Sequence, residues 1–143
     1  MHRLAIHVDY PGWVHSVVDW DRVYADDEQK MRLAIALARE NVLNDTGGPF
    51  GAAVFEADSG QLVAVGVNSV VRLGNCTLHR EMVAFMMAQR RVGSFTLGAP
   101  GMPAHELFTS CEPCAMCLGA TLWSGVKRLV CAAARDDASR LQF

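Results

Sequence analysis

Two short stretches decide the fold of this chain, Thr77-Leu78-His79-Arg80-Glu81 and Ser110-Cys111-Glu112-Pro113-Cys114-Ala115-Met116-Cys117. They have the form His-x-Glu followed by Pro-Cys-x-x-Cys. One imidazole and two thiolates give a zinc ion three protein ligands, one fewer than the closed tetrahedral set of a structural site. The two stretches therefore predict zinc bound by His79, Cys114 and Cys117, with a fourth position open to water.

Each stretch is expected to open a helix. Thr77 is a good N-cap before the apolar residues that follow it, and Pro113 suits the first turn of the next helix. Cys114 and Cys117 would then share one helix face, near the positive end of a helix dipole that favours thiolates. Glu81 supplies the carboxyl group that zinc-water chemistry needs to move protons, so it is the predicted catalytic residue.

Two other metal sites are compatible with these residues. Cys111, Cys114 and Cys117 form Cys-x-x-Cys-x-x-Cys, the opening of an iron-sulfur pattern, although position 121 holds Thr where a fourth ligand would stand. Alternatively, Cys76 could join the three predicted zinc ligands in a closed Cys3His structural site. The domain would then be non-catalytic, and Glu81 would be an ordinary acid on a helix surface.

Composition narrows the class of protein. The chain has 143 residues, 51% of them hydrophobic, and a formal net charge of -2, which indicates one globular domain and argues against disorder or a dedicated nucleic-acid binder. A small molecule is therefore the expected substrate. Three of the five cysteines lie within seven residues, which suits a metal site in a reducing compartment. No signal peptide or membrane span is recognisable, so we expect a cytoplasmic protein.

Hydrophobic periodicity and turn signals predict a mixed sheet between helices, a three-layer α/β/α domain over residues 26–143. Residues 1–25 are expected to form an N-terminal extension without chemistry, containing one short helix within 13–20. The expected elements of the domain are a helix over 27–44, hairpin strands at 51–55 and 62–67, a loop over 70–76, a helix to about 91, a strand at 106–110, a helix to about 123, a strand at 126–133 and a final turn at 135–141.

Beyond the zinc signature, the segments 47–52 and 111–120, together with Asn68 and Thr77, resemble the guanine-deaminase branch of the cytidine-deaminase superfamily. The likeness covers about residues 26–143. It implies a cytidine-deaminase-like fold, a homodimer, and zinc-dependent hydrolysis of an aminated nucleobase or related heterocycle, with guanine or a similar purine first. Cytosine, nucleoside, aminotriazine and tRNA adenosine deaminases are the alternatives.

The resemblance also implies roles for individual residues. The zinc ligands fall on His79, Cys114 and Cys117. Glu81 would shuttle protons between the water, the ring nitrogen and the leaving ammonia.

Substrate binding falls on a second set of residues. Asn68 would orient the edge of the base, and Phe50 and Trp123 would hold the faces of the ring. The backbone at Gly51 and Ala52 would approach the substrate.

Three features depart from the pattern of this branch. Arg80 stands where a small residue is usual, and Asn75-Cys76-Thr77 stands in place of Asp-Pro-Thr. The branch also has a tail beyond the last strand that supplies an acidic and an aromatic residue to the pocket, whereas this sequence ends at Phe143. Specificity for guanine is therefore not carried over by the resemblance alone.

Overall fold

A computed structural model describes residues 3–140. Its elements follow the chain in the order α1 (Val14–Val17), α2 (Asp27–Leu43), β1 (Gly51–Glu56), β2 (Leu62–Val67), α3 (Val70–Leu73), α4 (Arg80–Val92), β3 (His105–Cys111), α5 (Ala115–Ser124), β4 (Arg128–Ala133) and α6 (Arg135–Arg140). Among these residues, no helix is both long and apolar enough to cross a membrane.

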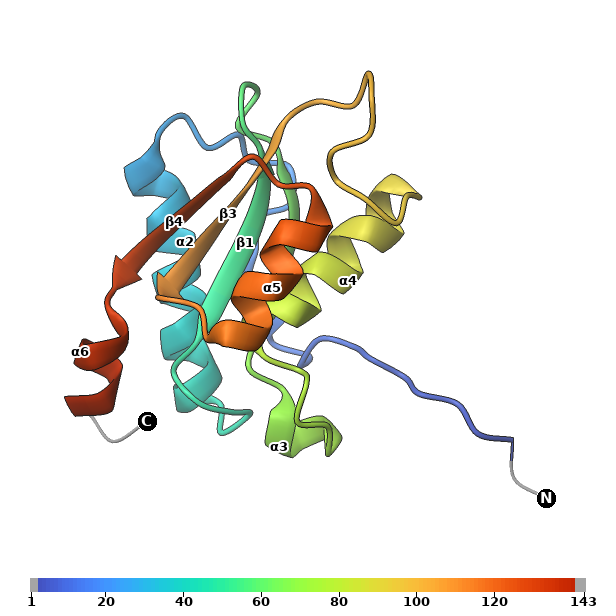
Figure 1. Cartoon of the computed structure of the whole chain (residues 1–143). Coiled ribbons are helices and arrows are strands. Elements are labelled where there is room, and N and C mark those ends of the chain that lie inside the picture. Colours follow the sequence, from blue (N-terminus) through green and yellow to red (C-terminus); the bar gives the residue numbers. More distant parts are fainter. Residues whose placement is uncertain (1–2, 141–143) are drawn as a thin grey trace.

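The sheet has the strand order β2-β1-β3-β4 and separates two layers of helices (Figure 1). Successive side chains of a strand point to opposite faces, so Ala53 and Phe55 of β1 pack with Leu37 of α2. Ala52 and Val54 point the other way, into a second cluster with α4. Figure 1 shows α2 behind the sheet and α5 in front of it. The expected three-layer α/β/α fold is confirmed.

The sheet is mixed because its strands have two kinds of connection. β1 pairs antiparallel with β2 through the expected hairpin and antiparallel with β3 on its other side. β3 and β4 are parallel, joined by a crossover that contains α5. This arrangement brings the end of β3 to the start of α5, where the cysteine stretch lies.

The N-terminal segment covers the free edge of β2. The Tyr10 hydroxyl donates to the Val65 carbonyl (2.7 Å) and accepts from the Val65 amide (3.2 Å). Val14 and Val18 are buried against the α2 face of the sheet. The Tyr10 hydroxyl thus occupies both backbone groups of Val65 that this edge would otherwise leave free.

Local hydrogen bonds explain where the sequence-based boundaries hold and where they were wrong. Asp26 caps α2, its side chain accepting from the Gln29 amide, so the helix begins where the sequence predicted it. Thr77 does not cap α4, because its hydroxyl and amide both donate to the Asn75 side-chain oxygen. The helix begins later, with His79 at the N-cap. Residues 70–73, expected as a loop, form the single helical turn α3.

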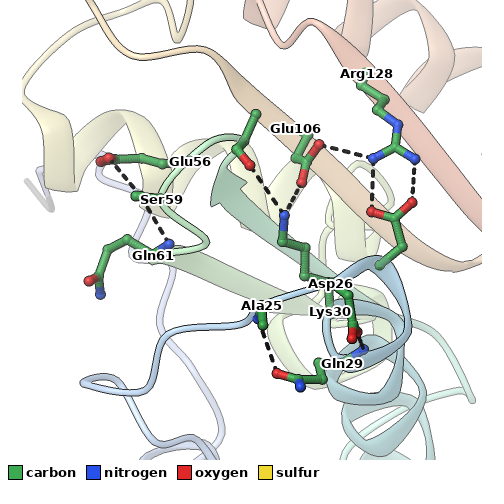
Figure 2. A network of polar contacts seen from close by, with 11 residues as sticks. Ala25, Asp26, Gln29, Lys30, Glu56, Ser59, Gln61, Glu106 and Arg128 are labelled. Carbon is green, nitrogen blue, oxygen red and sulfur yellow. Dashed lines mark hydrogen bonds and ion pairs between the residues drawn. The ribbon is translucent and has the colours of Figure 1, made fainter.

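A buried ion pair joins α2 to the sheet at the opposite end of β3 from the cysteine stretch (Figure 2). The Lys30 ammonium contacts the Glu106 carboxylate, and both side chains are nearly inaccessible to water. The half-exposed Arg128 adds a contact of 3.3 Å to Glu106 and a second to Asp27. Lys30 also lies 5.6 Å from the centre of the Phe55 ring. The network fixes α2 against β3 and β4.

We expect Lys30→Met to lower the free energy of unfolding by about 3 kcal/mol, because removal of one partner leaves a buried charge uncompensated. Arg128 still neutralises part of that charge, which places the effect at the lower end of the usual range. The matched control is Arg32→Met, on the same helix, which removes an exposed ion pair with Glu28 and should cost under about 1 kcal/mol. Urea unfolding of both variants checks this, and equal losses would contradict it.

Candidate active site

The site forms where the N-termini of α4 and α5 meet. His79 is the N-cap of α4 and Cys114 is the N-cap of α5, and both have extended backbone angles. The His79 Nδ1 lies 3.5 Å from the Cys114 Sγ. β2 allows this approach at Gly66, where a Cβ atom would collide with the Arg80 carbonyl. The first turn of α4 therefore rests directly on the sheet.

Cys117 completes a group of three metal-binding side chains. One ligand atom each from His79, Cys114 and Cys117 lies within 4.8 Å of the others, and no further group of three or more His, Cys, Asp and Glu is found in residues 3–140. The exposed Cys76 is outside this group. The buried Cys111 thiol instead faces the Ala134 carbonyl at 3.6 Å. The geometry favours the three-ligand set over both alternatives that the sequence left open.

The chemistry of these donors fits a metal cation. Burial raises the pKa of the Cys117 thiol, and the nearby Glu81 and Cys114 raise it further. A thiolate at this position therefore needs a strong positive charge beside it, which a divalent metal supplies. One imidazole and two thiolates are a ligand set typical of zinc.

Glu81 lies in the first turn of α4 and is completely buried. An Arg80 guanidinium nitrogen is 2.7 Å from one of its carboxylate oxygens. Neither oxygen makes a hydrogen bond of acceptable geometry to any residue in the described part of the chain. Buried carboxylate oxygens are nearly always hydrogen-bonded, so this pair is available to a ligand.

A cavity of about 320 Å³ opens above the metal-binding group. Phe50, Asn68, His79, Arg80 and Cys114 line it. The Asn68 side-chain oxygen accepts from the Val70 amide at 3.3 Å, as in a turn. Its amide nitrogen makes no hydrogen bond to residues 3–140 and can meet a ligand in the cavity.

Two predicted backbone contacts are close to this cavity but do not line it. Gly51 and Ala52 are buried in β1, and the Gly51 amide donates to the Ser110 hydroxyl at 3.1 Å. They place Phe50, the residue before them, at the wall of the cavity.

Trp123 is not among the residues that line this cavity, and its expected place at one face of the base stays a prediction. Its side chain is 89% exposed and borders a shallow depression between α4 and α5. Trp123 follows the inward-facing Cys117 by six residues, which is a rotation of roughly 240° around a helix. An aromatic residue near a helix end gave no sign of the face on which it would lie.

The sequence analysis missed the contribution of α6. Arg135, Ala138 and Ser139 line the mouth of the cavity. The Arg135 guanidinium donates to the Pro113 carbonyl, and its amide donates to the Glu112 side chain, each at 3.0 Å. A short polar helix carries no pattern that would reveal these contacts.

Comparisons with known proteins agree with this site. Residues 24–133 match the family described as the cytidine and deoxycytidylate deaminase zinc-binding region. A guanine deaminase of Bacillus subtilis is 37% identical over 116 residues, which are 81% of this chain and 70% of that protein. A solved guanine deaminase structure from Nitrosomonas europaea has a TM-score of 0.92 and 44% identity, covering 100% of this chain and 79% of that one. A mutant structure in complex with 8-azaguanine has a TM-score of 0.93 and 43% identity, covering 100% of this chain and 78% of that one.

The family match spans most of the chain and contains the whole metal-binding group. It confirms the resemblance inferred from the sequence and shows zinc as the cofactor of the family, and the His, Cys, Cys group is one that could bind a metal ion. The chain belongs to the cytidine and deoxycytidylate deaminase zinc-binding family and is a zinc-dependent hydrolytic deaminase.

Proposed function

We propose that this protein deaminates guanine and releases ammonia, with His79, Cys114 and Cys117 as the zinc ligands. The observation that carries the proposal is the buried Glu81 carboxylate, which faces Cys117 of the metal-binding group and makes no hydrogen bond of acceptable geometry within residues 3–140. Guanine is favoured because a curated relative at 37% identity and a solved structure at 44% identity are guanine deaminases.

Zinc, when bound, supplies a Lewis acid that makes water a nucleophile near neutral pH. Glu81 then acts as the proton carrier. Its carboxylate accepts a proton from the water and delivers protons to the ring nitrogen and to the departing amine. One oxygen lies beside the Arg80 guanidinium, and the other makes no hydrogen bond of acceptable geometry within residues 3–140, so it can take part in these transfers.

The cavity walls position the base. Phe50 offers a flat apolar ring, and aromatic rings stack in offset or edge-on arrangements. Asn68 offers an amide donor beside it. The fixed backbone at Gly51 and Ala52 sets the place of the Phe50 ring. Together these groups would hold the amino-bearing carbon in the cavity that His79 and Cys114 also line.

We expect Asn68→Ala to raise KM and also to lower kcat, together about 10- to 100-fold in kcat/KM, because the amide helps to align the reacting carbon in the transition state. The structure shows that the Asn68 oxygen also supports the turn at Val70. Asn68→Asp is therefore the paired variant, since it keeps that acceptor and loses the amide donor. Steady-state kinetics on guanine measures both. Unchanged kcat and KM in both variants would reduce Asn68 to a turn residue.

A substrate panel tests the proposal directly. Zinc-loaded protein is assayed for ammonia release from guanine, adenine, cytosine, guanosine and an aminotriazine. We expect guanine to have the highest kcat/KM. A higher kcat/KM for guanosine or cytosine would show that guanine is not the preferred substrate, while the proposed deamination chemistry would stand. No ammonia release from any of these amines would overturn the proposed activity.

We further propose that the protein works as a homodimer through the outer face of α5 and the adjacent loop. Leu118, Leu122 and Trp123 of α5 and Phe95 of the loop after α4 are large apolar side chains exposed on this side. Exposed apolar groups that gather on one face typically mark a subunit interface. Sedimentation of the wild type and of Leu122→Asp tests this. A monomeric wild type would contradict it.

The cytoplasm is the proposed location. Cys76 and Cys131 are exposed free thiols, and the metal site depends on cysteine ligands. Such a set of thiols persists in a reducing compartment.

A further inference from the structure

Arg80 lies between the metal ligand His79 and the carboxylate Glu81, and its long side chain is only 5% exposed. A cation in the first turn of a helix opposes the helix dipole, and burying it has a further desolvation cost. Contacts made by the guanidinium must offset both costs. Three such contacts are present, and each reaches a different part of the site.

The first contact reaches the cysteine stretch. The Arg80 Nη2 donates to the Cys111 carbonyl at 2.7 Å, with the Glu112 carbonyl at 3.4 Å. These carbonyls belong to the end of β3, just before Cys114. The guanidinium therefore ties the start of α4 to the segment that delivers the first cysteine ligand.

The second contact reaches Glu81. The Arg80 Nη2 lies 2.7 Å from one oxygen of the Glu81 carboxylate, which makes no hydrogen bond within residues 3–140. A long side chain such as Glu has several rotamers, and the guanidinium is the cation that faces the polar end of this one, beside the Cys117 thiol. The position of the carboxylate thus depends on the guanidinium.

The third contact anchors the guanidinium itself. Its central carbon lies 4.9 Å from the centre of the Phe50 ring, within the range of a cation-π interaction. Phe50 also lines the cavity. The planar group is thus held between the ring, the carbonyls and the carboxylate.

We propose that Arg80 is a positioning residue of the site, holding the Glu81 carboxylate in one arrangement relative to the cysteine segment and to the Phe50 wall. This inference rests on the proposed function. In this role Arg80 does not itself contact the substrate. A proton carrier displaced by about 1 Å can lose about 100-fold in rate, so the hold on Glu81 acts on kcat.

The test compares Arg80→Met, Arg80→Lys and a matched control, Arg91→Met. Arg91 is on the same helix and also donates to backbone carbonyls, those of Leu62 and Val63, but it is not among the residues that line the cavity. We expect Arg80→Met to keep its zinc and to lose about 10- to 100-fold in kcat, with KM within about threefold. Arg80→Lys should recover part of kcat, because an ammonium supplies the charge without the planar fork. Arg91→Met should keep kcat.

A kcat in Arg80→Met within about threefold of the wild type would overturn the inference. So would a loss of kcat that merely follows a loss of zinc, or a rise in KM alone. The second measurement does not depend on the substrate. Crystal structures should show the Glu81 carboxylate in more than one rotamer in Arg80→Met and in a single rotamer in the wild type and Arg91→Met. A single, unmoved Glu81 in Arg80→Met would contradict the inference even if guanine proves not to be the substrate.

Discussion

Glu81→Gln is expected to reduce ammonia release by at least about 10²- to 10⁴-fold while one zinc per chain is retained. The side chain keeps its shape, so the buried site around it is preserved. What is lost is the group that accepts and returns protons. Because the same carboxylate serves the water, the ring nitrogen and the leaving amine, no single proton source in the solvent replaces it.

Glu28→Gln is the matched control, since Glu28 occupies the first turn of α2 as Glu81 occupies that of α4. Its activity should equal that of the wild type. Metal analysis accompanies the kinetics. If Glu81→Gln loses its zinc, Glu81 is a ligand. If it remains fully active, Glu81 takes no part in the reaction.

Cys114→Ala is expected to lose the zinc and with it all measurable activity. Two ligands remain, and the buried Cys117 thiol has a raised pKa, so the metal charge that stabilised its thiolate is no longer held in place. The melting temperature should also fall, because metal binding to the folded state contributes to stability.

Cys76→Ser is the paired variant for this prediction. It removes an exposed thiol outside the ligand group and should keep both zinc and activity. The zinc content, measured by atomic emission spectroscopy, and the melting temperature are determined for both variants. Loss of zinc in Cys76→Ser would restore the closed structural site as the correct interpretation.

The metal-binding group could be predicted from the sequence because each motif is local. One helical turn brings Cys114 and Cys117 together. The position of His79 at the start of another helix was indicated by its own motif. The hairpin was likewise signalled by its own turn residues. The pairing of His79 with Cys114, which lies 35 residues further along the chain, rested instead on the combined motif and on the resemblance to the deaminase family.

What depended on distant contacts could not be predicted. Arg80 meets the Cys111 carbonyl across 31 residues of sequence, and nothing in either motif indicates that contact. The start of α4 was missed for a local reason: Thr77 had the residue type of an N-cap, yet Asn75, two residues earlier, takes both of its donors.

The central claim is that this zinc site has an open, catalytic position, and X-ray absorption at the zinc edge tests it most directly. The account predicts two sulfur ligands at about 2.3 Å from the zinc. It also predicts one imidazole nitrogen and one oxygen ligand, both at about 2.0–2.1 Å. The same spectrum should be unchanged in Cys76→Ser. A third sulfur in the zinc shell of the wild type would show a closed structural site and contradict the account.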